Sequence, residues 1–332
     1  MAFLIDDLLN PESLPDKTKE VSHIQTHISH VLVADYFVYK IKKAVDFGFL
    51  DFSTLEKRKH YCEQEIFLNR RLSEGIYLDV VPVFFDGRSH KIGKGRGEIV
   101  EYAVKMKRIP EDMLMKSIFE RGRLLKEHLR VIARILSGFH QTAQSSADID
   151  KCGNPEMFKI NTDENFHQTK NYIGITIKQK DFEALKKWTD NFYSENRDLF
   201  LERIRSGKIR DCHGDLHMEH ICLTEPVSIF DCIEFNTRFR YTDTLADIAF
   251  LLMDLEYGGG KYFSDILWHY YNDISGEGDR DAMLTFYKVY RAYVRGKVNS
   301  FQIDDERIAP DKKEEAIETA KKYFQLAVNY IS

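Results

Sequence analysis

Residues 209–250 read IRDCHGDLHMEHICLTEPVSIFDCIEFNTRFRYTDTLADIAF, and this stretch decides the fold. It places two aspartates in distinctive contexts. Asp215 follows His213 within His-Gly-Asp-Leu-His, and Asp231 ends the short run Val227-Ser228-Ile229-Phe230. Phosphoryl transfer needs a carboxylate to orient or deprotonate the attacking hydroxyl, and oxygen ligands for the metal ions that neutralise a triphosphate. Kinases take the first from a loop of the form H-x-D-x-x-x-x-N and the second from an aspartate further along the chain.

The stretch resembles the aminoglycoside phosphotransferase and choline-kinase branch of the protein-kinase-like fold, in which His-Gly-Asp-Leu-His is the wording of the catalytic loop. The resemblance implies that Asp215 is the catalytic base. It also implies that Asp231 chelates magnesium, with Glu234 as an assisting acid, and that Asp247 in Ala-Asp-Ile-Ala braces the catalytic loop from beneath. ATP and Mg²⁺ are therefore the expected cofactors.

His220 is the main departure, because it stands five residues after Asp215, where the motif usually has asparagine. Magnesium prefers oxygen, so a neutral imidazole is a poor substitute ligand. We keep His220 among the candidate cofactor-binding and metal-binding residues, with Glu219 or Glu234 as replacements for its role. A chain that has lost turnover for this reason would be a nucleotide-binding regulator.

The N-terminal half extends the resemblance. Residues 39–53 and 62–65 are similar to a bacterial subgroup known as bifunctional aminoglycoside phosphotransferase/ATP-binding proteins, which carry a P-loop domain behind the kinase-like one. The P-loop motif G-x-x-x-x-G-K-[ST] does not occur in this sequence. We therefore expect the kinase-like part without a P-loop domain.

A kinase-like site also needs a lysine on a strand to hold the phosphates and a glutamate on the next helix to position it. Lys40 and Glu65 fit that arrangement. Lys42 lies two residues on and so shares the strand face, and Glu63 is close to Glu65, so each choice has a competitor. The spacing from Glu65 to Leu72 matches the related helices and favours Glu65.

The order of elements agrees with an α+β, two-lobed protein-kinase-like fold, with an antiparallel sheet in the N-lobe and a mainly helical C-lobe. Runs of β-branched and aromatic residues predict two strands within 26–45 and further strands at 77–85 and 98–109. Between them, Ser53-Thr54-Leu55-Glu56 has capping-box spacing and predicts a helix to about residue 72.

Pro110 ends the last of these strands, so we place the lobe boundary there: residues 1–108 form a nucleotide-binding N-lobe, and 109–332 form a C-lobe with the catalytic loop and acceptor site. A hinge is expected near Met106–Arg108, with Met106 among the cofactor-binding residues. Residues 144–170 are polar and predict a loop. Helices are expected over 261–273, 280–301 and 311–330.

Composition limits the partners. The 332 residues are 43% hydrophobic and 30% charged, which is ordinary for a globular protein. A net charge of -5 gives no basic surface for nucleic acid, and no run is apolar enough to span a membrane. Five scattered cysteines and an N-terminus without signal-peptide features favour the cytoplasm. The oligomeric state stays open.

Several look-alike motifs are set aside. Asp46-Phe47-Gly48 spells the kinase metal motif, but it precedes the catalytic loop, whereas the functional aspartate must follow it. Residues 93–97, Gly-Lys-Gly-Arg-Gly, are expected to be a hairpin rather than a phosphate loop. The histidines and cysteines of 212–232 lack zinc-site spacing. Arg291 or Arg295, on a basic and aromatic helix, is a candidate for contact with an anionic substrate.

Together these features predict an ATP-dependent phosphotransferase that moves the γ-phosphoryl group to a hydroxyl of a small molecule. A catalytically weak regulator and a nucleotidylating enzyme on the same fold are the alternatives.

Overall fold

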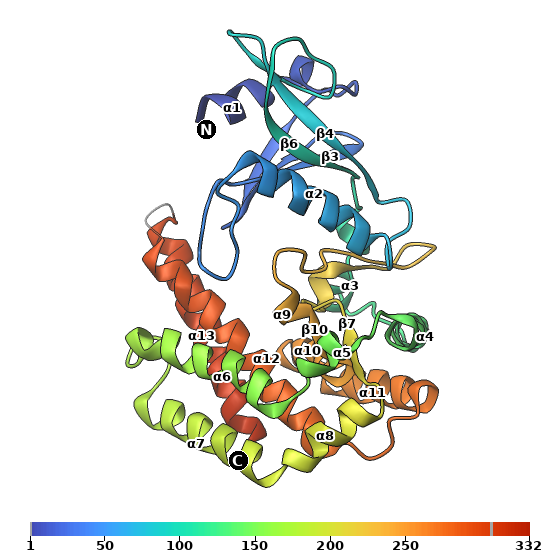
Figure 1. Cartoon of the computed structure of the whole chain (residues 1–332), viewed down its shortest axis with the longest axis vertical. Coiled ribbons are helices and arrows are strands. Elements are labelled where there is room, and N and C mark those ends of the chain that lie inside the picture. Colours follow the sequence, from blue (N-terminus) through green and yellow to red (C-terminus); the bar gives the residue numbers. More distant parts are fainter. Residues whose placement is uncertain (1, 306–307) are drawn as a thin grey trace. The chain divides into compact units, whose positions relative to one another are not determined.

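The computed structural model describes residues 2–305 and 308–332. The chain packs into two compact units. Unit 1 consists of the residues up to Arg123 together with Glu219–Thr237, and unit 2 consists of Leu124–Met218 and Arg238–Ser332. The boundary expected at residue 108 falls inside unit 1. Each unit is described by itself (Figure 1).

Unit 1 contains a six-stranded antiparallel sheet with the strand order β1-β2-β3-β6-β4-β5. The strands expected within 26–45, at 77–85 and at 98–109 are confirmed, and two short strands are added at the edges. The bounds are β1 Ser22–Gln25, β2 Ser29–Val33, β3 Phe37–Lys42, β4 Tyr77–Phe85, β5 His90–Ile92 and β6 Glu98–Lys107. Residues 93–97 connect β5 to β6, but these two strands pair with opposite edges of β4 and not with each other, so the predicted hairpin at 93–97 is wrong.

Both faces of this sheet are covered because neighbouring residues of a strand point to opposite sides. Ala103 of β6 belongs to a core cluster that includes residues of helix α1 (Ala2–Leu8). Val104 and Met106 of β6 belong to a second cluster, with Cys62 and Ile66 of helix α2 (Leu55–Asn69). Helix α2 therefore lies against β4 and β6 (Figure 1). This packing brings Glu65 of α2 to the sheet.

Helix α2 begins one residue later than the capping box predicted. Thr54 is its N-cap, and the Thr54 hydroxyl accepts a hydrogen bond from the backbone N–H of Lys57 at 3.3 Å. Ser53 instead donates its hydroxyl proton to Asp51 Oδ1, at 2.6 Å. Because its hydroxyl is bonded to Asp51, Ser53 does not cap the helix.

The remaining elements of unit 1 are short. After β6 come the 3₁₀ turn η2 (Glu111–Met113) and helix α3 (Met115–Glu120). The two-stranded hairpin of β8 (Ile221–Cys222) and β9 (Ser228–Ile229) belongs to the same unit, although it lies more than ninety residues further along the chain. It follows the 3₁₀ turn η4 (Met218–His220) and leads directly into Asp231.

Unit 2 is mainly helical. A two-stranded sheet of β7 (Ile209–Asp211) and β10 (Tyr241–Asp243) precedes helix α10. Its helices are α4 Lys126–Thr142, α5 Ala147–Lys151, α6 Pro155–Thr169, α7 Gln179–Glu195, α8 Arg197–Arg205, α9 Thr237–Arg240, α10 Thr244–Tyr257, α11 Lys261–Ser275, α12 Asp281–Phe301 and α13 Pro310–Tyr330. The three late helices expected from the sequence are thus confirmed.

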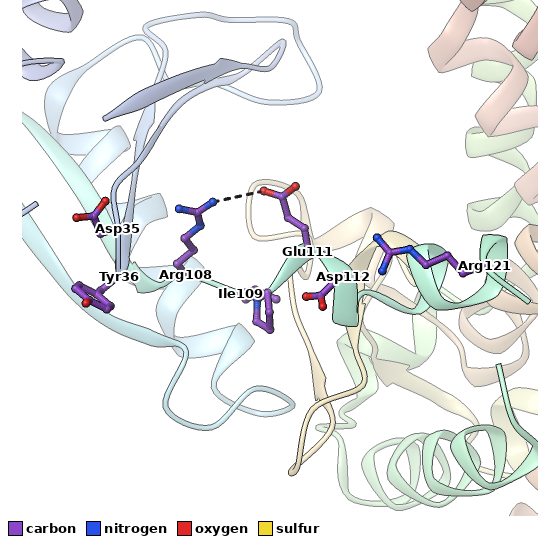
Figure 2. Close-up of a pocket in the computed structure, with 8 residues that line it drawn as sticks. Asp35, Tyr36, Arg108, Ile109, Glu111, Asp112 and Arg121 are labelled. Carbon is purple, nitrogen blue, oxygen red and sulfur yellow. Dashed lines mark ion pairs between the residues drawn. The ribbon is translucent and has the colours of Figure 1, made fainter. Parts of the chain in front are cut away.

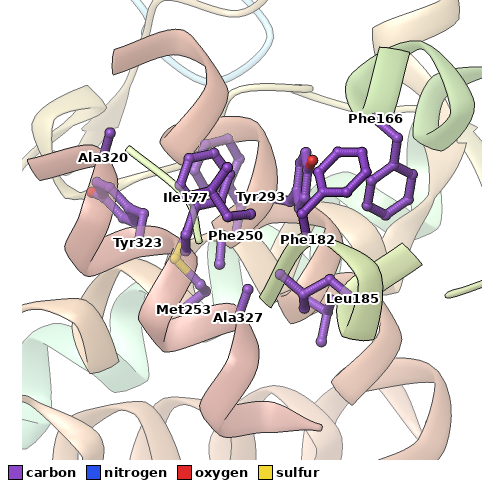
Figure 3. Close-up of a cluster of buried hydrophobic side chains, with 13 residues drawn as sticks. Phe166, Ile177, Phe182, Leu185, Phe250, Met253, Tyr293, Ala320, Tyr323 and Ala327 are labelled. Atoms are coloured by element: carbon purple, nitrogen blue, oxygen red, sulfur yellow. The ribbon is translucent and has the colours of Figure 1, made fainter. Parts of the chain in front are cut away.

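A large aromatic core joins these helices (Figure 3). It is built from α6, α7, α10, α12 and α13, and α12 and α13 pack along each other. Its buried members are Phe166, Ile177, Phe182, Leu185, Phe250, Met253, Val289, Ala292, Tyr293, Ala320, Tyr323, Phe324 and Ala327. Helices α10 and α12 are thereby fixed, and both carry residues that hold the loop around Asp215.

The prediction of a loop over residues 144–170 is wrong, because this segment forms α5 and α6. Helix α6 starts with Asn154 as its N-cap, followed by Pro155 in the first turn. Apart from Phe158 and Phe166, much of its buried face is polar, with Asn161 and Asn165 each about 5% exposed. A polar buried face leaves no apolar periodicity to detect.

Gly296 of α12 allows the close approach of α13. A Cβ atom at this position would lie 2.8 Å from the ring of the buried Phe324. We expect Gly296→Ala to lower the free energy of unfolding by about 1 kcal/mol, because overpacking costs about 1–3 kcal/mol and outweighs the better helix propensity of alanine, about 1 kcal/mol. Gly138 of α4 has open space around it, so Gly138→Ala should stabilise by about 0.5–1 kcal/mol. Urea unfolding of both variants checks the opposite signs; equal signs would contradict the packing argument.

None of the helices in the described ranges is long and apolar enough to cross a lipid bilayer.

Candidate active site

Two lysines of β3 and three carboxylates form a connected cluster in unit 1. Lys40 Nζ lies 2.9 Å from Glu65 Oε1 and 2.7 Å from Asp231 Oδ1. Lys42 Nζ lies 2.7 Å from Glu65 Oε2 and also pairs with Glu234. Glu65 therefore bridges both lysines. The structure brings together Lys40, Glu65, Asp231 and Glu234, which are separated by up to 194 positions in the sequence.

The two lysines differ in accessibility. The side chain of Lys42 is 0% exposed and lies between two buried carboxylates, whereas that of Lys40 is 15% exposed and that of Asp231 is 39% exposed. Glu63 is exposed and lies 3.8 Å from Lys59, one turn away on α2. Lys40 and Asp231 are thus the members of the cluster that a ligand can reach.

Electrostatics keep the cluster charged. Burial alone would lower the pKa of Lys40, but the carboxylates of Asp231 and Glu65 raise it well above its ordinary value. Burial raises the pKa of Glu234, while the two lysines hold that of Glu65 below its ordinary value despite its burial. Three carboxylates and two ammonium groups leave one negative charge in excess. That excess suits a cation with oxygen ligands.

Asp231 has an unusual backbone conformation. Its φ is 61°, the single positive value among non-glycine residues in the described ranges. The backbone N–H of Asp231 donates to the Tyr77 hydroxyl at 3.1 Å, and that of Cys232 donates to Asn69 Oδ1 at 2.8 Å. Side chains from β4 and from the end of α2 therefore hold the turn. Left-handed backbone in a non-glycine residue is a local strain that clusters at functional sites.

The other predicted residues of unit 1 differ in their surroundings. His220 Nε2 lies 3.4 Å from Asp231 Oδ2, so the unusual histidine is next to the predicted metal ligand. Glu234 directs its carboxylate to Lys42, and Glu219 pairs with Lys116 at 2.5 Å. Met106 is the second to last residue of β6 and packs against α2. Of the oxygen donors here, Asp231 best fits magnesium.

We expect Lys42→Met to lower the free energy of unfolding by about 3–5 kcal/mol, because it leaves Glu65 and Glu234 buried without their shared cation. Lys57→Met is the matched control: because its pair with Asp51 is exposed to solvent, this substitution should change the free energy of unfolding far less than Lys42→Met does. Urea denaturation followed by circular dichroism measures both. Equal losses would show that the buried ion pairs do not hold the cluster together.

In unit 2, Asp247 of α10 holds the backbone of the loop around Asp215. Its two carboxylate oxygens accept hydrogen bonds from the N–H groups of His213, at 2.9 Å, and Gly214, at 2.8 Å. His140 of α4 adds a contact from Nε2 at 3.1 Å, and its other ring nitrogen lies 2.8 Å from the Tyr271 hydroxyl. Despite full burial, the hydrogen bond and charge of His140, with the charges of His213 and Arg291, hold the pKa of Asp247 below its ordinary value.

Arg291 and Arg295, one turn apart on α12, lie close to the same loop. Arg291 donates to the carbonyl oxygens of Gly214, at 2.9 Å, and Ala246, at 3.0 Å, so it is engaged with backbone. Burial would lower the pKa of Arg295, but Tyr323 and the carboxylates of Asp215 and Asp254 raise it. The Arg295 guanidinium is therefore close enough to Asp215 for their charges to interact.

Asp215 is the accessible acid of this loop, with its side chain 34% exposed. Its backbone N–H donates to His213 Nδ1 at 3.3 Å, and its Oδ2 lies 3.5 Å from His217 Nε2. The backbone N–H of Met218 donates to Asp254 Oδ2 at 2.9 Å. Buried acids of α10 therefore fix both ends of the loop, and Asp215 projects from a rigid support.

The look-alike motifs lie elsewhere. Asp46 is exposed, and its Oδ1 accepts the N–H of Gly48 at 2.9 Å in a local turn. A pocket of unit 1 follows the end of β6 (Figure 2) and contains none of the predicted site residues. Its lining mixes charges of both signs, and Arg108 and Glu111 face each other across 4.0 Å. Neither feature joins the cluster around Lys40.

Sequence reasoning missed several supporting residues. Asn69 and Tyr77, which hold the Asp231 turn, carry no motif, because each acts through a single contact that only the fold creates. His140 and Asp254 were also missed. Arg291 was proposed as a substrate contact, but its guanidinium is buried against Phe250 and bonded to loop backbone. The available signal for His140 was its spacing of four residues from Leu136, which places a histidine in line with the apolar face of α4.

Comparison with protein families finds one match: the model of Peptidase family M54 aligns with residues 84–230, less than half of the chain. The zincin motif H-E-x-x-H does not occur in the sequence. Three potential ligands, His140, Cys212 and Asp247, lie together in unit 2. However, both ring nitrogens of His140 and both oxygens of Asp247 are already hydrogen-bonded within the protein. The residues thus give peptidase chemistry no support.

Among curated proteins, uncharacterised proteins of Mycobacterium tuberculosis and Mycobacterium bovis are 33% identical over 276 residues, which is 82% of this chain and 53% of theirs. The chain spans about half the length of the curated relatives it matches.

Solved structures similar to this chain are small-molecule kinases and their relatives. Amicoumacin kinase hAmiN matches with a TM-score of 0.53 and 13% identity, covering 96% of this chain and 89% of that one. A choline/ethanolamine kinase family protein from Mesorhizobium loti matches with a TM-score of 0.50 and 12% identity, covering 99% of both chains. At such identities the likeness shows the fold. The chain has the two-lobed kinase-like fold, with an antiparallel N-terminal sheet followed by a mainly helical region.

Proposed function

We propose that this protein transfers the γ-phosphoryl group of ATP to a hydroxyl group of a small molecule. The observation that carries the proposal is the cluster of Lys40, Glu65 and Asp231. It joins an accessible lysine, a buried glutamate that positions it, and an accessible carboxylate on a strained turn. This combination is what a nucleotide phosphate site requires in a kinase-like fold.

In this proposal each residue of unit 1 has a defined role. Lys40 exchanges its contact with Asp231 for the phosphate oxygens, and Glu65 keeps the ammonium group in place. Asp231 then offers its carboxylate to magnesium, which neutralises phosphate charge when bound. His220 lies 3.4 Å from that carboxylate and orients it, or takes the position of the second ligand. Met106 contributes to the nucleotide site from the end of β6.

Asp215 receives the acceptor hydroxyl. An ionised carboxylate at this position accepts a hydrogen bond from the hydroxyl group. The carboxylate therefore directs an oxygen lone pair of the acceptor toward the γ-phosphorus atom and takes up the hydroxyl proton. As the new P–O bond forms, the bond from the γ-phosphorus to the bridging oxygen breaks, and ADP leaves with that oxygen. The hydrogen bonds to Asp247 hold the loop in one conformation. The reaction therefore requires little further loss of conformational entropy in the loop.

The structural neighbours support the same class of reaction. Amicoumacin kinase hAmiN was solved with AMP-PNP, Ca²⁺ and Ami, an ATP analogue, a divalent cation and a small molecule. We extend this ligand set to the present chain as ATP, Mg²⁺ and a small-molecule acceptor. A protein substrate is disfavoured because only fifteen residues separate Asp231 from Asp247, too few for a long activation segment.

The test uses labelled ATP to find out which phosphate group is transferred and to which molecule. The protein is incubated with Mg-ATP labelled on the γ- or the α-phosphate and with a library of sugars, amino alcohols and aminoglycosides. Transfer of γ-label to a library member, with ADP as the product, supports the proposal. Labelling of the protein from the α-phosphate would replace it with nucleotidylation. Thermal stabilisation of the protein by ATP without any transfer, in magnesium and manganese alike, would indicate a nucleotide-binding regulator instead. The histidine at position 220, where the motif usually has asparagine, is the feature that suggests this alternative.

A further inference from the structure

The buried face of α6 is polar and faces α12. Asn161, Thr162, Asn165 and Thr169 are all at least nine-tenths buried and recur at helical spacing. The two threonines have partners, because Thr162 contacts the Tyr193 hydroxyl at 3.3 Å and Thr169 the Tyr293 hydroxyl at 2.5 Å. Asn161 Oδ1, in contrast, has no hydrogen-bond partner within residues 2–305 and 308–332. A buried amide oxygen without a partner is costly and calls for a ligand or water.

Lys297 of α12 reaches the same face. Its ammonium group donates to Asn165 Oδ1 at 2.6 Å and to Gln168 Oε1 at 2.9 Å. Both acceptors are neutral amides, and no carboxylate of the described residues lies within ion-pairing distance of Lys297. The buried Lys42, by comparison, sits between two carboxylates. An ammonium group has three N–H donors, and two of those of Lys297 are used in these contacts, so the third can donate to a ligand.

The charges around Lys297 do not cancel. Glu164 of α6 and Arg238 of α9 are the charged groups whose fields reach it, and they form a two-pronged pair with each other at 2.9 and 2.6 Å. One carboxylate therefore faces two cations. Burial, together with the repulsion from Arg238 and against the attraction of Glu164, lowers the pKa of Lys297 to about 8. A negative charge next to Lys297 would reverse that shift.

Helix α12 links this cluster to the catalytic loop. Arg295, whose field reaches Asp215, precedes Lys297 by two residues, a rise of about 3 Å along the helix axis. Arg295 Nε is also buried without a hydrogen-bond partner in the described part of the chain. The same helix thus presents one cation near Asp215 and a second, incompletely neutralised one toward α6.

We propose that the cluster of Lys297, Arg238, Asn165, Gln168 and Asn161 binds an anionic group, a carboxylate or a phosphate, carried by the acceptor molecule. This inference rests on the proposed function only in calling the ligand an acceptor. Lys297 donates its third hydrogen bond to the anion, and Asn161 Oδ1 accepts one from a hydroxyl of the same molecule. A cationic acceptor would meet uncompensated positive charge here. Lys297 is accordingly a specificity-determining residue.

The test compares three probes that share one pyranose ring: D-glucose, D-glucuronate and D-glucose 6-phosphate. Isothermal titration calorimetry of the full chain at pH 8, without ATP and in two buffers of different ionisation enthalpy, measures affinity and proton uptake. We expect at least one charged probe to bind about tenfold tighter than glucose, as a charge-assisted hydrogen bond provides, and to take up protons as the pKa of Lys297 rises. Equal binding of all three probes overturns the proposal.

Variants assign the effect to Lys297. Lys297→Met should remove both the tenfold preference and the proton uptake. Lys297→Arg should keep the preference without the uptake, because arginine stays protonated at pH 8, and it shows that the positive charge matters rather than the packing. Lys322→Met, at an exposed lysine of α13, is the control and should behave as the parent protein. Proton uptake that persists in Lys297→Met contradicts the assignment.

The two proposals fail separately. If γ-phosphoryl transfer is found only to neutral or cationic acceptors and Lys297→Met transfers at the parent rate, the anion site is wrong and the phosphotransferase stands. If the charged probes bind through Lys297 but no acceptor is phosphorylated, the anion site stands and the proposed function is wrong.

Discussion

Asp215→Asn should lower kcat for phosphoryl transfer by about 10²–10⁴-fold, the contribution typical of a positioned general base. Asparagine keeps the size of the side chain but neither carries the negative charge nor takes up a proton. The affinity for ATP should change by less than about threefold, because in the proposed mechanism Asp215 contacts the acceptor hydroxyl, whereas Lys40 and Asp231 hold the phosphates and magnesium. A coupled assay of ADP release gives kcat, and calorimetry with a non-hydrolysable ATP analogue gives the affinity.

Stability should change little in this variant. Asp215 is one-third exposed, and the contacts that hold its loop are made by Asp247, Asp254 and Arg291, none of which is altered. Asp148→Asn is the control, since Asp148 is an exposed acid paired with Lys151 and should retain full activity. An Asp215→Asn protein that turns over at more than about a tenth of the parent rate would remove Asp215 from the chemistry.

The parts of the fold that the sequence predicted are those with a strong local signal. β3 and β6 combine β-branched and aromatic residues, and α12 and α13 repeat apolar residues every three to four positions. Helix α6 was missed because its buried face consists largely of amide and hydroxyl side chains. A sequence segment rich in such polar residues is typical of a loop. The chemistry that makes α6 hard to detect is also what makes it a candidate binding surface.

The candidate site shows the same division. The loop around Asp215 and the turn at Asp231 are each formed by consecutive residues, so the sequence alone reveals them. The choice between Lys40 and Lys42 is different, because both lie on one strand and both contact Glu65. What separates them is Glu234, which lies 192 residues from Lys42 and engages it in the interior. Lys40 as the phosphate-binding lysine stays a prediction, and its accessibility is what favours it.

Asp231→Asn should abolish the stabilisation of the protein by Mg-ATP over ATP alone and lower kcat/KM by about 10²–10⁴-fold, since a catalytic metal contributes several kcal/mol. Asparagine isolates the charge, because it tolerates the left-handed backbone at φ 61° better than most residues do. The substitution also removes the single excess negative charge of the cluster. Lys40 keeps its contact with Glu65, so the fold should persist. Thermal unfolding with ATP, with and without magnesium, measures the effect.

Asp46→Asn is the matched control for Asp231→Asn, because Asp46 carries the Asp-Phe-Gly wording of kinases but lies in an exposed local turn. It should respond to Mg-ATP as the parent protein does. Asp231→Ala adds a second comparison. It removes the same charge but should also lower the free energy of unfolding by about 1 kcal/mol, because alanine adopts left-handed backbone less readily than asparagine. If Asp231→Asn retains the magnesium effect, the excess negative charge around Lys40 is a structural feature. In that case the metal must take its oxygen ligands elsewhere.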